Sequence, residues 1–170
     1  MTVDFGTEYG IMQLSISLYL LVTAFMQIFI GPISDKFGRR PVVITSLSVF
    51  ALASLGCYFA QTIEVFLIFR MLQASVASAM VLSRAIVRDV VPQDQAASTI
   101  GYVTMGMSLV PMFAPTLGGF LAPWFGWRSI FVFLTAFGFG LAALCWVDQG
   151  ETQKGGGVSF REQIEGYPEL

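Results

Sequence analysis

The chain has 170 residues, of which 55% are hydrophobic and only 12% are charged, and its formal net charge at pH 7 is −2. A soluble domain carries roughly 25% charged residues, and the mean hydropathy here is +0.73. This composition excludes an ordinary soluble domain, and so small a net charge gives no reason to expect a nucleic-acid partner.

Five apolar blocks are each about as long as the ~20-residue helix that crosses a membrane. They carry no strict alternation of polar and apolar residues, which excludes strands of a membrane β-barrel. We therefore predict an all-α integral membrane protein that interacts with the lipid bilayer, with a transmembrane domain over residues 1–148. The predicted spans are residues 11–33, 42–61, 64–84, 97–122 and 129–147.

The Lys and Arg residues of the short loops predict the orientation, because basic loops lie on the cytoplasmic side. They follow the first, third and fifth spans, and the opposite side has only Arg128. We therefore expect the N-terminus outside and the C-terminal tail in the cytoplasm. The basic residues on the predicted cytoplasmic side are Lys36, Arg39, Arg40, Arg84, Arg88, Lys154 and Arg161.

The N-terminal segment then lies outside, with Asp4 and Glu8 and no basic residue. It has neither the basic region nor the cleavage site of a signal peptide. A further helix that precedes Met1 and starts in the cytoplasm would explain this placement, and we favour that interpretation. The alternative is a five-span protein with its N-terminus outside.

Two polar residues of the first predicted span, Tyr19 and Gln27, are candidates for lining a cavity. Gln27 is the better candidate, because an amide rarely faces lipid.

The stretch GPISDKFGRRP, residues 31–41, places four charged residues in one tight connection. Gly31 would allow close approach of a neighbouring helix, and Gly38 would allow a turn with positive φ. Asp35 adds nothing to the positive-inside bias, and a carboxylate here can bind a helix N-terminus or a basic neighbour. From the residues alone, a contact between helices and a solvated basic turn both remain open.

Arg70 is a guanidinium within the third span, where charged residues are costly and are functional candidates by default. The alternative is that Arg70 lies near the outer interface and extends its charge to water. Cys57 and Cys145 lie in predicted spans and are expected to pack as small apolar residues.

The fourth span contains Pro111, Pro115, Gly118 and Gly119. Prolines and paired glycines allow a bend or a close contact in a membrane helix, although an ordinary kinked helix has the same pattern. Residues 149–170 are polar and glycine-rich, and we expect a cytoplasmic linker with a short helix at residues 159–165.

No histidine is present, which removes the commonest metal ligand, and there is no Walker-type glycine loop. We therefore expect no metal, no cofactor and no enzymatic activity.

The connection at residues 31–41 resembles the signature between the second and third helices of the major facilitator superfamily. The resemblance implies that this motif acts as a gate element, which holds the cytoplasmic side shut in the outward-facing state. It also implies an acidic partner at the cytoplasmic end of the fourth helix. The resemblance implies a contact between Arg39 and Asp89. The matching residues are Gly31, Asp35, Lys36, Gly38, Arg39 and Arg40.

Two later segments extend the resemblance. Arg70 and Gln73 match a pattern of the family's fourth helix, with Ala74 in place of the usual glycine, which implies a role in coupling. Residues 106–131 resemble the fifth-helix motif of exporters, and together with RAIVRD they are most similar to drug exporters of the bicyclomycin-resistance type. The matching residues of that fifth-helix motif are Pro115, Gly118 and Gly119, whereas Ala114 stands where glycine is common.

The resemblance implies proton-coupled export of small drug-like molecules across the inner membrane by alternating access. It covers helices two to six and the start of the central loop, without the first helix and the second half. None of the predicted spans has a carboxylate at mid-depth. An uptake transporter of the same superfamily and a truncated, non-transporting membrane protein are the alternatives.

Overall fold

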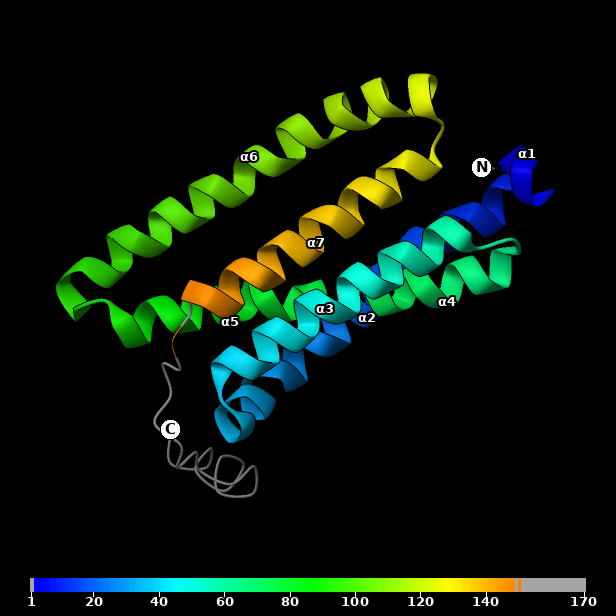
Figure 1. Ribbon diagram of the computed structural model, residues 1–170. Helices are drawn as coiled ribbons and strands as arrows, with labels where there is room; N and C mark the ends of the chain where they lie inside the picture. The colour runs from blue at the N-terminus through cyan, green and yellow to red at the C-terminus, as the bar shows by residue number, and fades with distance from the viewer. Residues whose placement is uncertain (1, 149, 151–170) are drawn as a thin grey trace.

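The computed structural model describes residues 2–148 and residue 150 of the chain. This part of the chain is helical and contains no strand. The helices in chain order are α1 (Thr2–Phe5), α2 (Tyr9–Phe37), α3 (Arg39–Phe59), α4 (Ile63–Gln73), α5 (Val76–Val90), α6 (Gln93–Phe125) and α7 (Arg128–Asp148). Figure 1 shows the long helices running side by side as a bundle.

The predicted all-α membrane class is confirmed, because five helices in the described residues are long and apolar enough to cross a membrane. The first two are α2 and α3. The third, Ile63–Val90, consists of α4 and α5, and the last two are α6 and α7. Most of them extend a few residues beyond the predicted spans, and the third continues to Val90 rather than ending near residue 84. The predicted linker at 149–170, with its helix at 159–165, lies outside the described residues apart from residue 150.

The third span is broken between α4 and α5, which the sequence analysis did not predict. The N–H of Ala74 donates to the carbonyl of Met71, and the N–H of Ser75 donates to the carbonyl of Leu72, each at 3.1 Å. These bonds reach back three residues, as in a tight 3₁₀ turn. The hydroxyl of Ser75 also donates to the carbonyl of Ser46 at 3.0 Å, which fixes the turn against α3.

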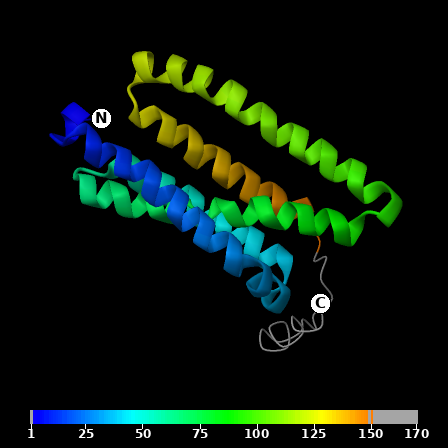
Figure 2. The ribbon, with the colours of Figure 1, turned by 180° about the vertical axis from the view of Figure 1, so that it is seen from behind.

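Helix α3 lies at the centre of the packing and contacts α7, α4 and α5 (Figures 1 and 2). Its contact with α7 is close because Gly138 lacks a side chain. A Cβ atom on Gly138 would lie 3.0 Å from the Cβ of Ala51 and 3.0 Å from Cδ1 of Phe50. Small residues allow such backbone approach, which gives membrane helices their dispersion contacts.

Two groups of buried apolar residues form the core, one toward each end of the bundle. One group joins α2, α3, α5 and α7 and contains Ile30, Val42, Val43, Leu47, Leu82 and Ala142. The other joins α3, α4 and α7 and contains Cys57, Ala60, Ile63, Phe66 and Phe131. Cys57 is fully buried without a disulfide, as expected of a packing residue, and Cys145 is also a free thiol.

Helix α6 differs from the others because none of its residues is buried. It packs against α5 and α7, which precede and follow it in the chain, and both ribbon views show it on the outside of the bundle (Figures 1 and 2). Three prolines lie inside this helix, at positions 111, 115 and 123, without ending it.

Candidate functional site

A cluster of three charged side chains joins α2, α3 and α5 at one end of the bundle. The Nε atom of Arg39 lies 2.9 Å from Oδ2 of Asp89, and its Nη2 atom lies 3.7 Å from Oδ1 of Asp35. The Arg39 side chain is only 14% exposed, whereas the two carboxylates are 29% and 27% exposed. We call Asp35, Arg39 and Asp89 the charged cluster.

The backbone around Gly38 brings this cluster together. Helix α2 ends at Phe37 and α3 begins at Arg39, so the connection is a single residue. Gly38 has a φ of 91°, and its N–H donates to the carbonyl of Ser34 at 2.9 Å. The predicted positive-φ turn is confirmed, and only glycine adopts this conformation without strain. The reversal places Arg39 one turn from Asp35, within reach of α5.

The predicted contact between Arg39 and Asp89 is present, although 50 residues separate them in the chain. Lys36 is not part of this contact; its Nζ lies 5.4 Å from the ring centroid of the neighbouring Phe37. The expected close helix contact at Gly31 is wrong for the described residues, because a Cβ there would meet no atom within 4 Å.

A second polar group lies within the membrane-spanning part of the bundle. Nη1 of Arg70 donates to Oε1 of Gln73 at 2.8 Å, and Nε2 of Gln73 donates to Oγ of Ser54 at 2.7 Å. Gln73 and Ser54 are fully buried. Arg70 is half-buried and hydrogen-bonded toward the interior, which favours an internal role over extension toward water.

Tyr19 and Arg70 lie together, with the guanidinium carbon 5.1 Å from the centroid of the tyrosine ring. Arg70 also lines a cavity of about 370 Å³ between α2, α4 and α7. The polar wall of this cavity includes Gln13 and Ser15, which the sequence analysis did not select. Gln27 is exposed on α2 and is not among the residues that line this cavity.

The α6 residues predicted as a bend or close contact do not form a close contact with the described residues. A Cβ on Gly119 would meet no atom within 4 Å, and one on Gly118 would meet only Cδ1 of Ile130, at 3.9 Å. Of the two predicted alternatives, the close contact is therefore absent within the described part of the chain, and the bend stays a prediction. Pro111 and Pro115 lie inside a continuous helix.

Contacts between distant residues show which helix ends share one side of the bundle. The start of α3 meets the end of α5 through Arg39 and Asp89, and it meets the end of α7 because Arg40 donates to the carbonyl of Trp146. At the opposite end, the indole N–H of Trp127 donates to Oδ2 of Asp4 at 2.8 Å.

Sequence reasoning missed two partners that the fold supplies, Ser54 for Gln73 and Trp146 for Arg40. Ser54 is a small polar residue in an apolar span, and serine often forms hydrogen bonds between membrane helices, which was the available signal for an interhelical polar contact. No comparable signal marked Trp146. In the part of the chain that the structure describes, no group of three metal-ligating side chains was found.

Comparisons with known proteins place these features in a family. Residues 1–166 match the family described as Major Facilitator Superfamily. The chain is 36% identical over 150 residues to a protein named "Chloramphenicol resistance protein" from Pseudomonas aeruginosa, which covers 87% of this chain and 36% of that protein. It is 32% identical over 132 residues to "Multidrug resistance protein D" from Escherichia coli K12, covering 77% of this chain and 34% of that protein.

A third relative is named "Bicyclomycin resistance protein homolog" and comes from Haemophilus influenzae. The identity is 34% over 132 residues, covering 77% of this chain and 33% of that protein. The chain therefore spans about a third of the length of these curated relatives.

Proposed function

The chain belongs to the major facilitator superfamily, and on this basis we propose that it is part of a transporter that exports small drug-like molecules by alternating access. Three similar proteins are named for resistance to chloramphenicol, bicyclomycin or several drugs, which supports export over uptake. The observation that carries the proposal is the Arg39–Asp89 ion pair, which joins two spans at one end of the bundle.

In this proposal the charged cluster is a gate on the cytoplasmic side. Arg39 pairs with Asp35 on α2 and with Asp89 on α5, so separating these helix ends requires breaking charge-assisted contacts. Such contacts favour the state in which the helix ends are together, and substrate or proton binding would shift the balance toward the open state. Gly38 supplies the turn, and Lys36 and Arg40 add positive charge on this side.

The proposed coupling element is the group formed by Arg70 and Gln73. The carboxylates of the five spans lie only in first or last helical turns, at Asp35, Glu64, Asp89, Asp94 and Asp148. Arg70, by contrast, lies seven residues from the start of the span Ile63–Val90 and lines a cavity. We propose that it responds to protonation of a carboxylate on a segment of the transporter beyond these five helices.

Helix α6 is proposed to bend during the transport cycle around Pro111, Pro115, Gly118 and Gly119. Pro115 has no N–H to donate to the carbonyl of Pro111, so the helix lacks one backbone hydrogen bond at this turn. The helix has no buried residue to hold it rigid against the described bundle.

The proposed location is the inner membrane, with the charged cluster in the cytoplasm and the N-terminal segment outside. The end of the bundle that contains the charged cluster also contains Lys36, Arg40 and Arg88, whereas Arg128 is at the other end, which agrees with the positive-inside rule. Because the aligned part of this chain covers only about a third of each of these relatives, we propose that a further first helix and a second half complete the transporter.

The experiment that tests this function uses the complete reading frame in a bacterial host that lacks its main efflux pumps. Everted vesicles should accumulate a fluorescent drug when a proton gradient is imposed and stop when an ionophore collapses it. Asp89→Asn should reduce accumulation, and Lys36→Gln should not. Uptake of the drug into intact cells would favour the import alternative. A protein that transports the drug in neither direction would contradict the proposal.

A further inference from the structure

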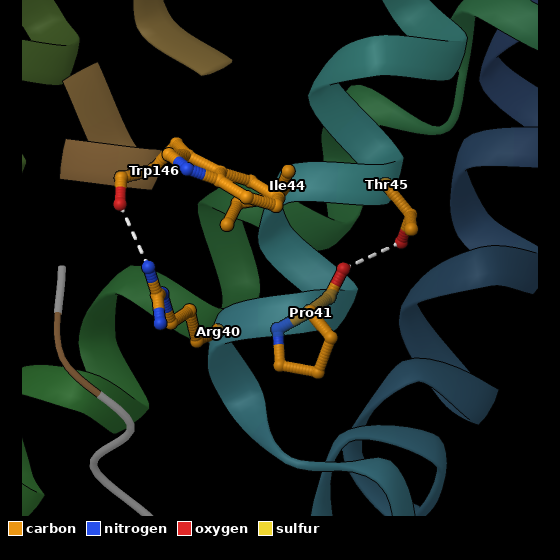
Figure 3. Close-up of a pocket in the computed structure, with 5 residues that line it drawn as sticks. All are labelled: Arg40, Pro41, Ile44, Thr45 and Trp146. Atoms are coloured by element: carbon orange, nitrogen blue, oxygen red, sulfur yellow. Dashed lines mark hydrogen bonds between the residues drawn. The ribbon is translucent and has the colours of Figure 1, made fainter. Parts of the chain in front are cut away.

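A cavity of about 310 Å³ lies between the start of α3 and the end of α7, apart from the cavity that Arg70 lines. It is lined by Arg40, Pro41, Ile44, Thr45 and Trp146 (Figure 3). We propose that this cavity binds an anionic phospholipid, with the phosphate on Arg40 and the first part of an acyl chain against the apolar wall. This inference does not depend on the direction or substrate of transport.

The wall of the cavity is suited to hydrocarbon. Pro41, Ile44 and the ring of Trp146 present carbon atoms, and the hydroxyl of Thr45 is used within its own helix. That hydroxyl donates to the carbonyl of Pro41 at 2.7 Å and lies 3.1 Å from the carbonyl of Val42 (Figure 3). A polar solute would find few partners here, whereas burying acyl groups against such a wall is favourable.

Arg40 is the cation of this site. Its Nη2 donates to the carbonyl of Trp146 at 2.7 Å, and its guanidinium carbon lies 5.8 Å from the centroid of the Trp146 ring. These two contacts fix the guanidinium at the edge of the cavity. Its Nε is buried and has no hydrogen-bond acceptor among the described residues. A buried donor without an acceptor is costly, so a ligand that supplies an oxygen would be stabilised.

The charge of Arg40 distinguishes an anionic lipid from a zwitterionic one. Arg39, the adjacent residue, has two carboxylates within 4.0 Å, whereas Arg40 forms no ion pair within the described part of the chain. A guanidinium binds phosphate oxygens in a planar fork, and its net charge is balanced only if the whole headgroup is negative.

The depth of the cavity agrees with a lipid headgroup. Arg40 lies in the first turn of α3 and Trp146 lies in the last turn of α7, so the cavity is at the ends of two spans. Tryptophan and arginine at the end of a membrane helix lie at headgroup level. Clusters of basic residues next to a span attract anionic lipids of the cytoplasmic leaflet.

Native mass spectrometry of the full chain in detergent tests the site, with phosphatidylglycerol and phosphatidylcholine as probes. We expect wild-type protein to retain phosphatidylglycerol more strongly, and Arg40→Gln to weaken that binding roughly tenfold because it removes charged hydrogen bonds to phosphate. Lys36→Gln is the matched control, since Lys36 is a basic residue at the same end of the bundle that does not line the cavity. The affinity of this variant for phosphatidylglycerol should equal that of wild type.

Further arms identify the occupant. Arg40→Lys keeps the charge and loses the fork, so it should bind more weakly than wild type and more tightly than Arg40→Gln, and it serves if Arg40→Gln does not fold. Equal retention of the two lipids, or wild-type binding by Arg40→Gln, would overturn the proposal. Displacement of the lipid by millimolar inorganic phosphate would also overturn it, because the occupant would then be a soluble anion. Lipid binding only after residues 151–170 are removed would overturn it as well, because the C-terminal tail would then fill the cavity.

Discussion

Nε of Arg39 lies 2.9 Å from Oδ2 of Asp89, and this ion pair joins the first residue of α3 to the last turn of α5. Asp35, one turn earlier at the end of α2, lies 3.7 Å from the same guanidinium. Arg39 is therefore shared between two helices other than its own. Moving α5 away from α2 and α3 must break the shorter of these contacts.

Asp89→Asn should weaken the proposed gate. The pair is partly exposed, so we expect a loss of roughly 1 kcal/mol in the free energy that holds the helix ends together. That loss would shift the open–closed balance about fivefold, and we expect slower drug efflux by the complete transporter in everted vesicles. Asp89→Glu keeps the charge and is the control. Equal efflux by wild type and Asp89→Asn at equal expression would show that the ion pair has no gating role.

Gln73→Leu should destabilise the bundle. The substitution removes two hydrogen bonds at a fully buried position, one donated by Arg70 and one accepted by Ser54. Nη1 of Arg70 and Oγ of Ser54 each lose this partner. We expect a loss of roughly 1–3 kcal/mol, seen as a lower thermal midpoint in detergent. Ser17→Ala, at an exposed position of α2, is the control. A Gln73→Leu protein as stable as wild type would indicate that the group contributes no net stability.

Two glycines of α7 should respond differently to the same substitution. Gly138→Ala places a methyl group 3.0 Å from the Cβ of Ala51, so α3 and α7 must separate, at a cost of roughly 1–3 kcal/mol. Gly140→Ala, half a turn away, meets no atom within 4 Å and should be neutral or stabilising, because alanine favours helix. Thermal unfolding of the two variants measures the difference, and equal midpoints would argue against close packing at Gly138.

The proposed orientation can be tested by labelling introduced cysteines. In a background with Cys57→Ala and Cys145→Ser, a cysteine in place of the exposed Gln61 between α3 and α4 should react with a membrane-impermeant maleimide added to intact cells. A cysteine in place of Lys36 should react only after the membrane is opened. The reverse pattern would place the charged cluster outside the cell.

Pro115→Ala should stiffen α6. An alanine restores the N–H that can donate to the carbonyl of Pro111, so the helix gains a backbone hydrogen bond and resists bending. We expect slower efflux by the complete transporter with unchanged or higher thermal stability. Pro123→Ala, near the end of the same helix, should change efflux little. Wild-type efflux by Pro115→Ala would remove this residue from the proposed bending mechanism.

The sequence by itself determined the number and class of the elements. Length and apolarity alone define a membrane helix, because the bilayer requires about 20 apolar residues and internal hydrogen bonds. The turn at Gly38 was also predictable, because a glycine between two adjacent spans allows the positive φ that reverses the chain. The Arg39–Asp89 contact was predicted as well, but from a family resemblance rather than from spacing.

The tertiary structure alone decided which residues meet across the bundle. The break at Ala74 and Ser75 is held by the carbonyl of Ser46, a residue 29 positions from Ser75. Arg40 lies 106 positions from the Trp146 carbonyl that it contacts, and Gln73 lies 19 positions from Ser54. In an apolar helix every face has nearly the same hydrophobicity, so the sequence pattern cannot show which face packs against which neighbour. Helix rotation and contact pairs follow from shape and polar partners on other helices.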